Sequence, residues 1–124
     1  MLLCANWDLV DVTNTYSGSS AWTYYDKNNT VCTFYRNEQT HSCIVTVHTV
    51  TITEVPENTA VAIGSNAILN TYKPKCSIAA PFSLQNAIVL LIKNGTNESL
   101  ALTTRMGSIP SGTTIEMQLE WHYF

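Results

Sequence analysis

The fold class is decided by the last stretch of the chain, Ile115-Glu116-Met117-Gln118-Leu119-Glu120-Trp121-His122-Tyr123. Every odd position in it is apolar and every even position is polar, which is the period of a β-strand with one buried face. Pro110-Ser111-Gly112 stands just before it and predicts a turn. We therefore expect a long final strand, central in its sheet, with Trp121 on the buried side.

The rest of the chain also divides into strand-length runs that turn signals separate. Residues 21–25 and 30–36 predict a hairpin around the turn Asp26-Lys27-Asn28-Asn29. Further strands are predicted over residues 6–13 (with a bulge at Asp11), 42–53, 60–64, 86–93 and 98–104, the last two joined by Asn94-Gly95. No segment keeps a helical period. The sequence thus predicts an all-β, antiparallel β-sandwich as a single domain over residues 1–124, with little helix.

Charge is scarce in this chain and limits the classes of partner. Only 12% of the 124 residues are charged and the net charge is −3, against about 25% charged residues in ordinary soluble domains. No cluster of Lys and Arg is present, which argues against nucleic acid and against a polybasic membrane contact. No apolar run approaches the roughly 20 residues of a membrane span.

The four cysteines are Cys4, Cys32, Cys43 and Cys76. An even number permits disulfides, above all in a secreted protein. No CxxC pair is present and no histidine lies at zinc-finger spacing, so we expect no structural zinc. Buried free thiols are the favoured interpretation, with disulfides as the alternative.

Catalytic patterns are missing from the sequence. The histidines His41, His48 and His122 show no HExxH spacing, and no GxSxG marks a nucleophile. Glu116 and Glu120 share one strand face, where a solvated face or a subunit contact is a simpler explanation than a glycosidase pair. We expect a protein that is not an enzyme and has no catalytic residue, metal or cofactor.

Aromatic side chains gather in the predicted hairpin and suggest a binding surface. A flat apolar ring with a polar edge suits a sugar ring or a protein contact. The candidate ligand-binding residues are Trp22, Tyr24, Tyr25, Asp26, Asn28 and Tyr35. The competing interpretation is that the aromatic residues belong to the core or to a subunit contact.

The second half of the chain, from residue 55 to residue 124, carries a further pattern. Tyr72-Lys73-Pro74 and Ala80-Pro81 precede an apolar strand, Asn94-Gly95, a Leu100-Ala101-Leu102 strand and the alternating last strand. This half resembles the C-terminal receptor-binding head or tip domain of tail-fibre and baseplate proteins of bacteriophages and prophages.

The resemblance implies a jelly-roll-like β-sandwich, a homotrimer and adhesion to a bacterial surface saccharide. It also implies a C-terminal module of a longer chain in a virion tail, which is assembled in the reducing bacterial cytoplasm and is extracellular when it acts. No family motif assigns the binding residues. The alternatives are a structural fibre or baseplate module without a ligand, and a secreted lectin-like domain with oxidised cysteines.

Overall fold

The computed structural model describes residues 7–15, 20–65, 72, 78–81, 87–92, 99–105 and 107–123. Among these residues are eight β-strands and two short 3₁₀ helices. The strands are β1 (Asp8–Thr15), β2 (Val31–Asn37), β3 (Ser42–Val50), β4 (Ala60–Ser65), β5 (Ile78–Pro81), β6 (Ala87–Ile92), β7 (Ser99–Thr104) and β8 (Thr114–His122). The helices are η2 (Ser20–Thr23) and η3 (Lys27–Asn29).

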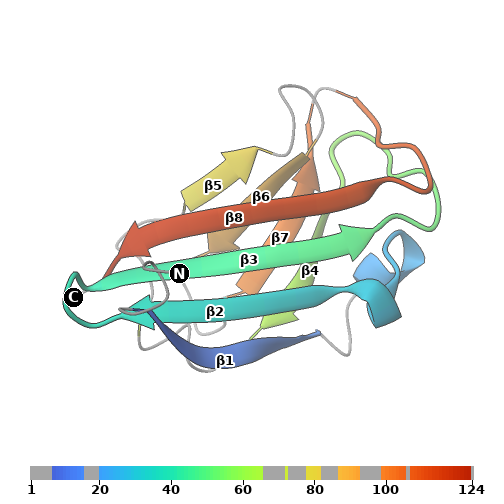
Figure 1. Ribbon diagram of the computed structural model, residues 1–124. Coiled ribbons are helices and arrows are strands. Elements are labelled where there is room, and N and C mark those ends of the chain that lie inside the picture. Colours follow the sequence, from blue (N-terminus) through green and yellow to red (C-terminus); the bar gives the residue numbers. More distant parts are fainter. Residues whose placement is uncertain are drawn as a thin grey trace.

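The strands form one antiparallel sheet that folds over on itself. Their order is β5-β6-β7-β4-β1-β2-β3-β8, and each pair of neighbours is antiparallel. Figure 1 shows β1, β2, β3 and β8 in front and the other four strands behind. The predicted all-β, antiparallel class with little helix is confirmed, whereas the jelly-roll sandwich stays a prediction.

Strand β1 carries the sheet from its front half to its back half. It pairs with β2 from Asp8 to Thr13, and its end pairs with β4 at Asn14 and Thr15. The register with β2 shifts between Leu9 and Asp11, which is the bulge that the sequence predicted near Asp11. A bulge bends its strand and increases the local twist, so this position suits a strand that belongs to both halves.

The last strand has the predicted pattern but not the predicted place. Its apolar side chains are buried and its polar side chains are exposed in strict alternation along β8. Every residue from Thr114 to His122 pairs with β3, yet β8 stands at one end of the strand order and is not central. Alternation of apolar and polar residues shows only that one face of a strand is buried. It does not distinguish a central strand from one that has a single paired neighbour.

The core lies between the two halves of the sheet. Across the front half, the register places Phe34, Val45 and Leu119 side by side, and all three are buried. The rings of Trp121 and Phe34 meet edge to face, with a centroid distance of 5.7 Å and an interplanar angle of 76°. The Nε1 of Trp121 donates a hydrogen bond to the carbonyl oxygen of Tyr72. The back half contributes Val61, Ile63, Leu100 and Leu102 to the same cluster.

Residues 21–25 do not form the predicted strand. Ala21 O instead accepts hydrogen bonds from Tyr24 N and Tyr25 N, at 2.9 and 2.8 Å, as part of the turn that holds η2. The hairpin partner of β2 is β3, and β1 occupies its other edge. Because a strand has only two hydrogen-bonding edges, the aromatic segment has no place beside β2.

Two of the four cysteines lie in the described part of the chain. Cys32 and Cys43 are free and buried, in agreement with the favoured interpretation. Cys4, Cys76 and the turn Asn94-Gly95 lie outside the described residues, although β6 and β7 on either side of that turn pair as predicted. No helix among the described residues is long and apolar enough to cross a membrane.

The first prediction concerns Trp121, whose side chain is 5% exposed. Trp121→Ala should lower the free energy of unfolding by about 3–5 kcal/mol, because it leaves a cavity beside Phe34. Glu120→Ala, next to it on the exposed face, should change stability by less than about 0.5 kcal/mol. Urea unfolding followed by circular dichroism measures both, and equal losses would contradict the burial pattern of β8.

Candidate functional site

The structure divides the six predicted ligand-binding residues into three groups. Trp22, Tyr24, Asp26 and Asn28 lie together on the segment from η2 to η3, Tyr25 lies in the core, and Tyr35 lies on β2. Figure 1 places η2 and η3 at one end of the front half of the sheet, beside the start of β2 and the end of β3.

The segment is fastened to the end of β3 around Tyr25. Asp26 N donates to Val50 O and Ile52 N donates to Tyr24 O, both at 2.8 Å. The Tyr25 side chain is fully buried, contrary to its predicted place on a binding surface. A ligand at the surface therefore cannot touch it, and its role is to anchor the aromatic residues on either side.

Trp22 and Tyr24 form what we call the aromatic ledge. Both side chains are half-buried and pack against the core cluster. Core residues therefore hold each ring in place, and part of its surface stays open to solvent. Lys27 Nζ lies 6.0 Å from the centroid of the Trp22 ring, at the outer limit of a cation–π contact. Lys27 was not among the predicted site residues, although its position in the same turn as Asp26 could have indicated it.

Asp26 holds the turn beside the ledge. Its Oδ1 accepts from the backbone N of Asn28 at 3.1 Å, and its Oδ2 accepts from Nδ2 of Asn29 at 2.9 Å. It is the N-cap of η3, a position that aspartate favours because its carboxylate satisfies free backbone N–H groups. Each carboxylate oxygen accepts more than one hydrogen bond, so Asp26 and the exposed Asn28 can also contact hydroxyl groups of a ligand.

Tyr35 lies away from the ledge. It is four positions along β2 from Val31, the first residue of that strand, and at about 3.3 Å per residue this is roughly 13 Å. It pairs with Ile44 on β3 and with Leu9 on β1. The prediction grouped Tyr35 with Trp22 because it assumed a hairpin that the structure does not contain.

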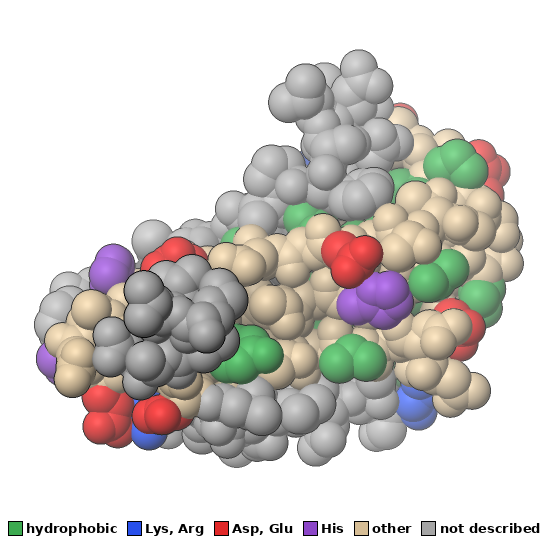
Figure 2. Space-filling view, viewed as in Figure 1, with side chains coloured by type: hydrophobic (Ala, Val, Ile, Leu, Met, Phe, Trp, Pro, Cys, Tyr) green, Lys and Arg blue, Asp and Glu red, His purple; other side chains and the backbone are tan. Residues whose placement is uncertain are grey.

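The outer face of β2, β3 and β8 is a second exposed surface. A shallow depression of about 370 Å³ is lined there by Val31, Thr46, Gln118 and the pair His48–Glu116, among others. His48 Nδ1 lies 3.8 Å from Glu116 Oε2, and both side chains are well exposed. Figure 2 shows this face as mostly uncharged, with a histidine beside an acidic side chain near its middle.

Reactive and metal-binding groups are scarce in the described part of the chain. No group of three or more His, Cys, Asp and Glu residues that could hold a metal ion occurs there. Burial raises the pKa of Cys32 to about 12, and it raises the pKa of Cys43 to about 12 although the nearby Arg36 opposes the shift. Because the thiolate is the nucleophilic form, these two buried thiols are inert at neutral pH.

Comparison of the chain with protein-family models, with curated proteins and with solved structures found no match. A function must therefore be argued from the ledge, the outer face and the chemistry of their side chains.

The second prediction concerns the Tyr25 hydroxyl, which is buried without a hydrogen-bond partner among the described residues. An unsatisfied buried hydroxyl costs about 1–3 kcal/mol. Tyr25→Phe removes it and keeps the ring, so the variant should be as stable as the wild type at pH 7 or more stable. Tyr25→Ala should lose about 3–5 kcal/mol. Thermal unfolding of the two variants tests this, and a loss above about 1 kcal/mol for Tyr25→Phe would reveal a partner for the hydroxyl.

The same variant has a distinct response to alkaline pH. Burial, aided by Tyr24, raises the pKa of Tyr25 from 10.0 to about 12, and Cys32 and Cys43 shift upward from 9.0. The unfolded chain loses these protons first, so stability is intact below pH 9 and falls as the pH rises toward 12. The free energy of unfolding of Tyr25→Phe should fall less steeply between pH 10 and 12. The difference in slope from the wild type should be up to about 1.4 kcal/mol per pH unit.

Proposed function

We propose that this chain is a non-enzymatic adhesion module of the phage tail-fibre or baseplate type, which binds a bacterial surface saccharide at the aromatic ledge. The observation that carries the proposal is the pair of half-exposed rings, Trp22 and Tyr24, on a segment that the buried Tyr25 fixes to the core. A rigid aromatic surface loses little conformational entropy when a ligand binds.

Saccharide chemistry fits the groups around the ledge. The apolar face of a pyranose ring stacks on an aromatic plate, while its hydroxyl groups need hydrogen-bond partners that fix orientation. Asp26 accepts hydrogen bonds, and the exposed Asn28 amide both donates and accepts. The weak overall charge, −3 over 124 residues, suits a polar ligand with little charge better than a densely charged polyanion.

The free thiols support the proposed place of assembly. Cys32 and Cys43 are buried and unpaired, as expected for a protein that folds in a reducing cytoplasm before the virion is released. They count against the secreted lectin-like alternative, whose cysteines would be oxidised. One observation supports the other alternative, a structural module without its own ligand. The outer face is mostly uncharged (Figure 2), and subunit contacts are poor in charged residues.

The third prediction tests the ledge. Trp22→Ala and Tyr24→Ala should abolish binding of the protein to arrayed bacterial cell-wall polysaccharides, because each variant removes a stacking surface. Each should cost about half of the roughly 3–5 kcal/mol that a fully buried aromatic residue contributes, so the variants stay folded.

Tyr35→Ala is the matched control, since it removes an aromatic ring from β2, away from the ledge. Its binding should equal that of the wild type. Normal binding by both ledge variants, or loss in Tyr35→Ala alone, would refute the assigned surface. A wild-type protein that binds no polysaccharide on the array would favour the purely structural module.

The fourth prediction is that the protein is a homotrimer, as the resemblance implies. The sequence places an apolar run at residues 88–92, whose side chains lie outside the described part of the structure. The outer face adds one exposed apolar side chain, Val31, which is 49% exposed; a contact region needs a larger contiguous apolar patch, so the prediction rests mainly on the resemblance. Multi-angle light scattering at micromolar concentration should give three times the chain mass of 13.7 kDa, and a monomer would contradict the prediction.

A further inference from the structure

The other end of β2 carries a cluster that the ledge does not use. Arg36 pairs with Cys43, which in turn pairs with Trp121. Paired residues in neighbouring strands point to the same face of a sheet, so the Arg36 side chain lies on the core side, where Cys43 and Trp121 are buried. Its side chain is only 21% exposed. A cation at such a place needs partners for its N–H groups.

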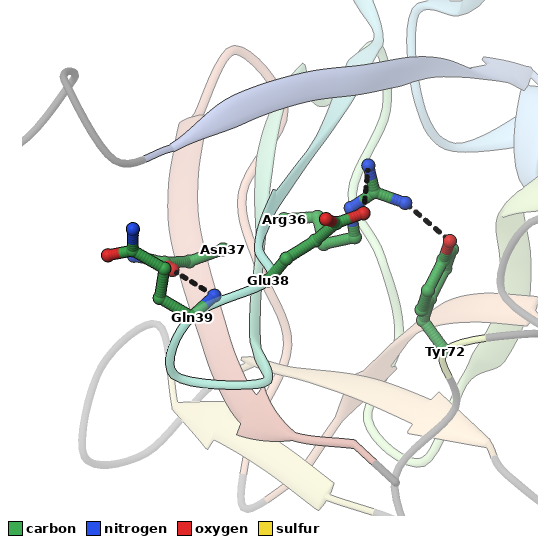
Figure 3. Close-up of polar contacts among 5 residues, drawn as sticks. All are labelled: Arg36, Asn37, Glu38, Gln39 and Tyr72. Atoms are coloured by element: carbon green, nitrogen blue, oxygen red, sulfur yellow. Dashed lines mark hydrogen bonds and ion pairs between the residues drawn. The ribbon is translucent and has the colours of Figure 1, made fainter.

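Two of the three guanidinium nitrogens of Arg36 have a partner among the described residues, and the third, Nε, has none. Nη1 donates to the hydroxyl of Tyr72, and Nη2 lies 2.9 Å from Oε1 of Glu38. Figure 3 shows Glu38 and Tyr72 approaching the guanidinium from different sides. Nε is buried and has no partner among the described residues. On the edge formed by Nε and Nη2, only Nη2 therefore contacts a carboxylate in the described part of the chain. Arginine binds carboxylates best when both nitrogens of such an edge donate parallel hydrogen bonds.

Glu38 is a weak occupant of this edge. Its side chain is 66% exposed, and an ion pair that is open to water contributes little to stability. The backbone around it is fixed by the buried Asn37. Its Oδ1 accepts from Gln39 N at 3.0 Å (Figure 3) and from Thr40 N at 3.3 Å. The Glu38 side chain can leave the guanidinium by bond rotation while the turn stays in place.

Two tyrosine rings adjoin the guanidinium. Its central carbon lies 5.2 Å from the centroid of the Tyr72 ring. The rings of Tyr72 and Tyr123 meet edge to face at a centroid distance of 4.8 Å, and both side chains are partly exposed. A carboxylate at Arg36 would thus have an aromatic surface beside it that suits an apolar sugar face.

The geometry points to a second subsite at Arg36, which takes a uronic acid unit of a saccharide. The sugar carboxylate displaces Glu38 and accepts hydrogen bonds from both Nη2 and Nε, while the pyranose ring lies against Tyr72 and Tyr123. The oxyanion site stands on the Arg36 contacts alone, and only the choice of a sugar as carrier rests on the proposed function. In the unliganded protein, the carboxylate of Glu38 stands in for that of the ligand.

Calorimetric titration of the 124-residue protein with methyl α-D-galacturonoside tests this subsite. Methyl α-D-galactoside, which carries CH₂OH in place of the carboxylate, should bind at least tenfold more weakly. Arg36→Lys keeps the charge but removes the two-donor edge, and should weaken galacturonoside binding at least tenfold. Glu38→Gln removes the competing carboxylate and should tighten binding several-fold. Glu116→Gln, which removes the same charge from the exposed face of β8, should bind as the wild type does.

Several results would overturn the subsite. One is that the wild type binds no galacturonoside at tens of millimolar, or binds the galactoside with equal affinity. Another is that the affinity for the galacturonoside is unchanged in Arg36→Lys, or does not increase in Glu38→Gln. Tighter binding of inorganic phosphate would reassign the site to a phosphate-bearing ligand. Should Arg36→Lys not fold, Tyr72→Phe removes the hydroxyl that holds Nη1 and should also weaken binding. Trp22→Ala should bind the galacturonoside normally, so failure of the ledge and failure of this subsite are separable.

Discussion

The structure depends on the complete pairing of β3. Its residues from Ser42 to His48 pair with β2 on one edge, and all of its residues pair with β8 on the other. From Ser42 to His48, both hydrogen-bonding edges of β3 are therefore occupied. Other segments can form backbone hydrogen bonds only with residues after His48 or with another strand. The buried alternation of β8 follows from this register, since each inward residue of β3 has an inward partner on β8.

The end of β3 fixes the loops at the ledge end of the sheet. Thr51, which is buried, donates from its hydroxyl to Pro110 O at 2.7 Å and accepts from Thr113 N at 2.8 Å. Its other neighbour is Tyr25, in an isolated bridge. A single threonine therefore joins the turn before β8 to the segment that carries the aromatic ledge. The hydroxyl of Thr51 is thus both a donor and an acceptor, and such satisfied buried groups help to hold a binding surface rigid.

The two ends of β2 differ in the chemistry that they offer. At its start, the ledge combines half-exposed aromatic rings with an aspartate that is already engaged as a helix cap. At its end, Arg36 lies between a tyrosine and an exposed glutamate, and its Nε has no partner among the described residues. The first arrangement suits an uncharged sugar face and the second suits a carboxylate. Both sit on or beside strands of the front half, so the sheet sets the distance between them.

Local periodicity was sufficient to determine the fold class, the inward side of β8 and the bulge in β1. These features depend on which side chains are buried. In a strand with one buried face, the buried side chains recur at every second residue, so the sequence shows them directly. The burial of Cys32 and Cys43 also follows from their place in alternating strands. The proposals of a phage-type function and of a homotrimer rest on the resemblance, and periodicity says nothing about either.

Tertiary structure alone decided which elements lie side by side. Residues 21–25 have the composition of a strand, but both edges of β2 are occupied and Ala21 O is engaged in a turn, so the segment became a 3₁₀ helix and a bridge. Because both edges of β2 are paired with other strands, Tyr35 lies away from the ledge. The side chain of Tyr25 is buried in the core. Tertiary structure also placed β8 at the end of the sheet. The cluster of Arg36 with Tyr72 joins residues 36 positions apart, and only packing of the folded chain could bring them together.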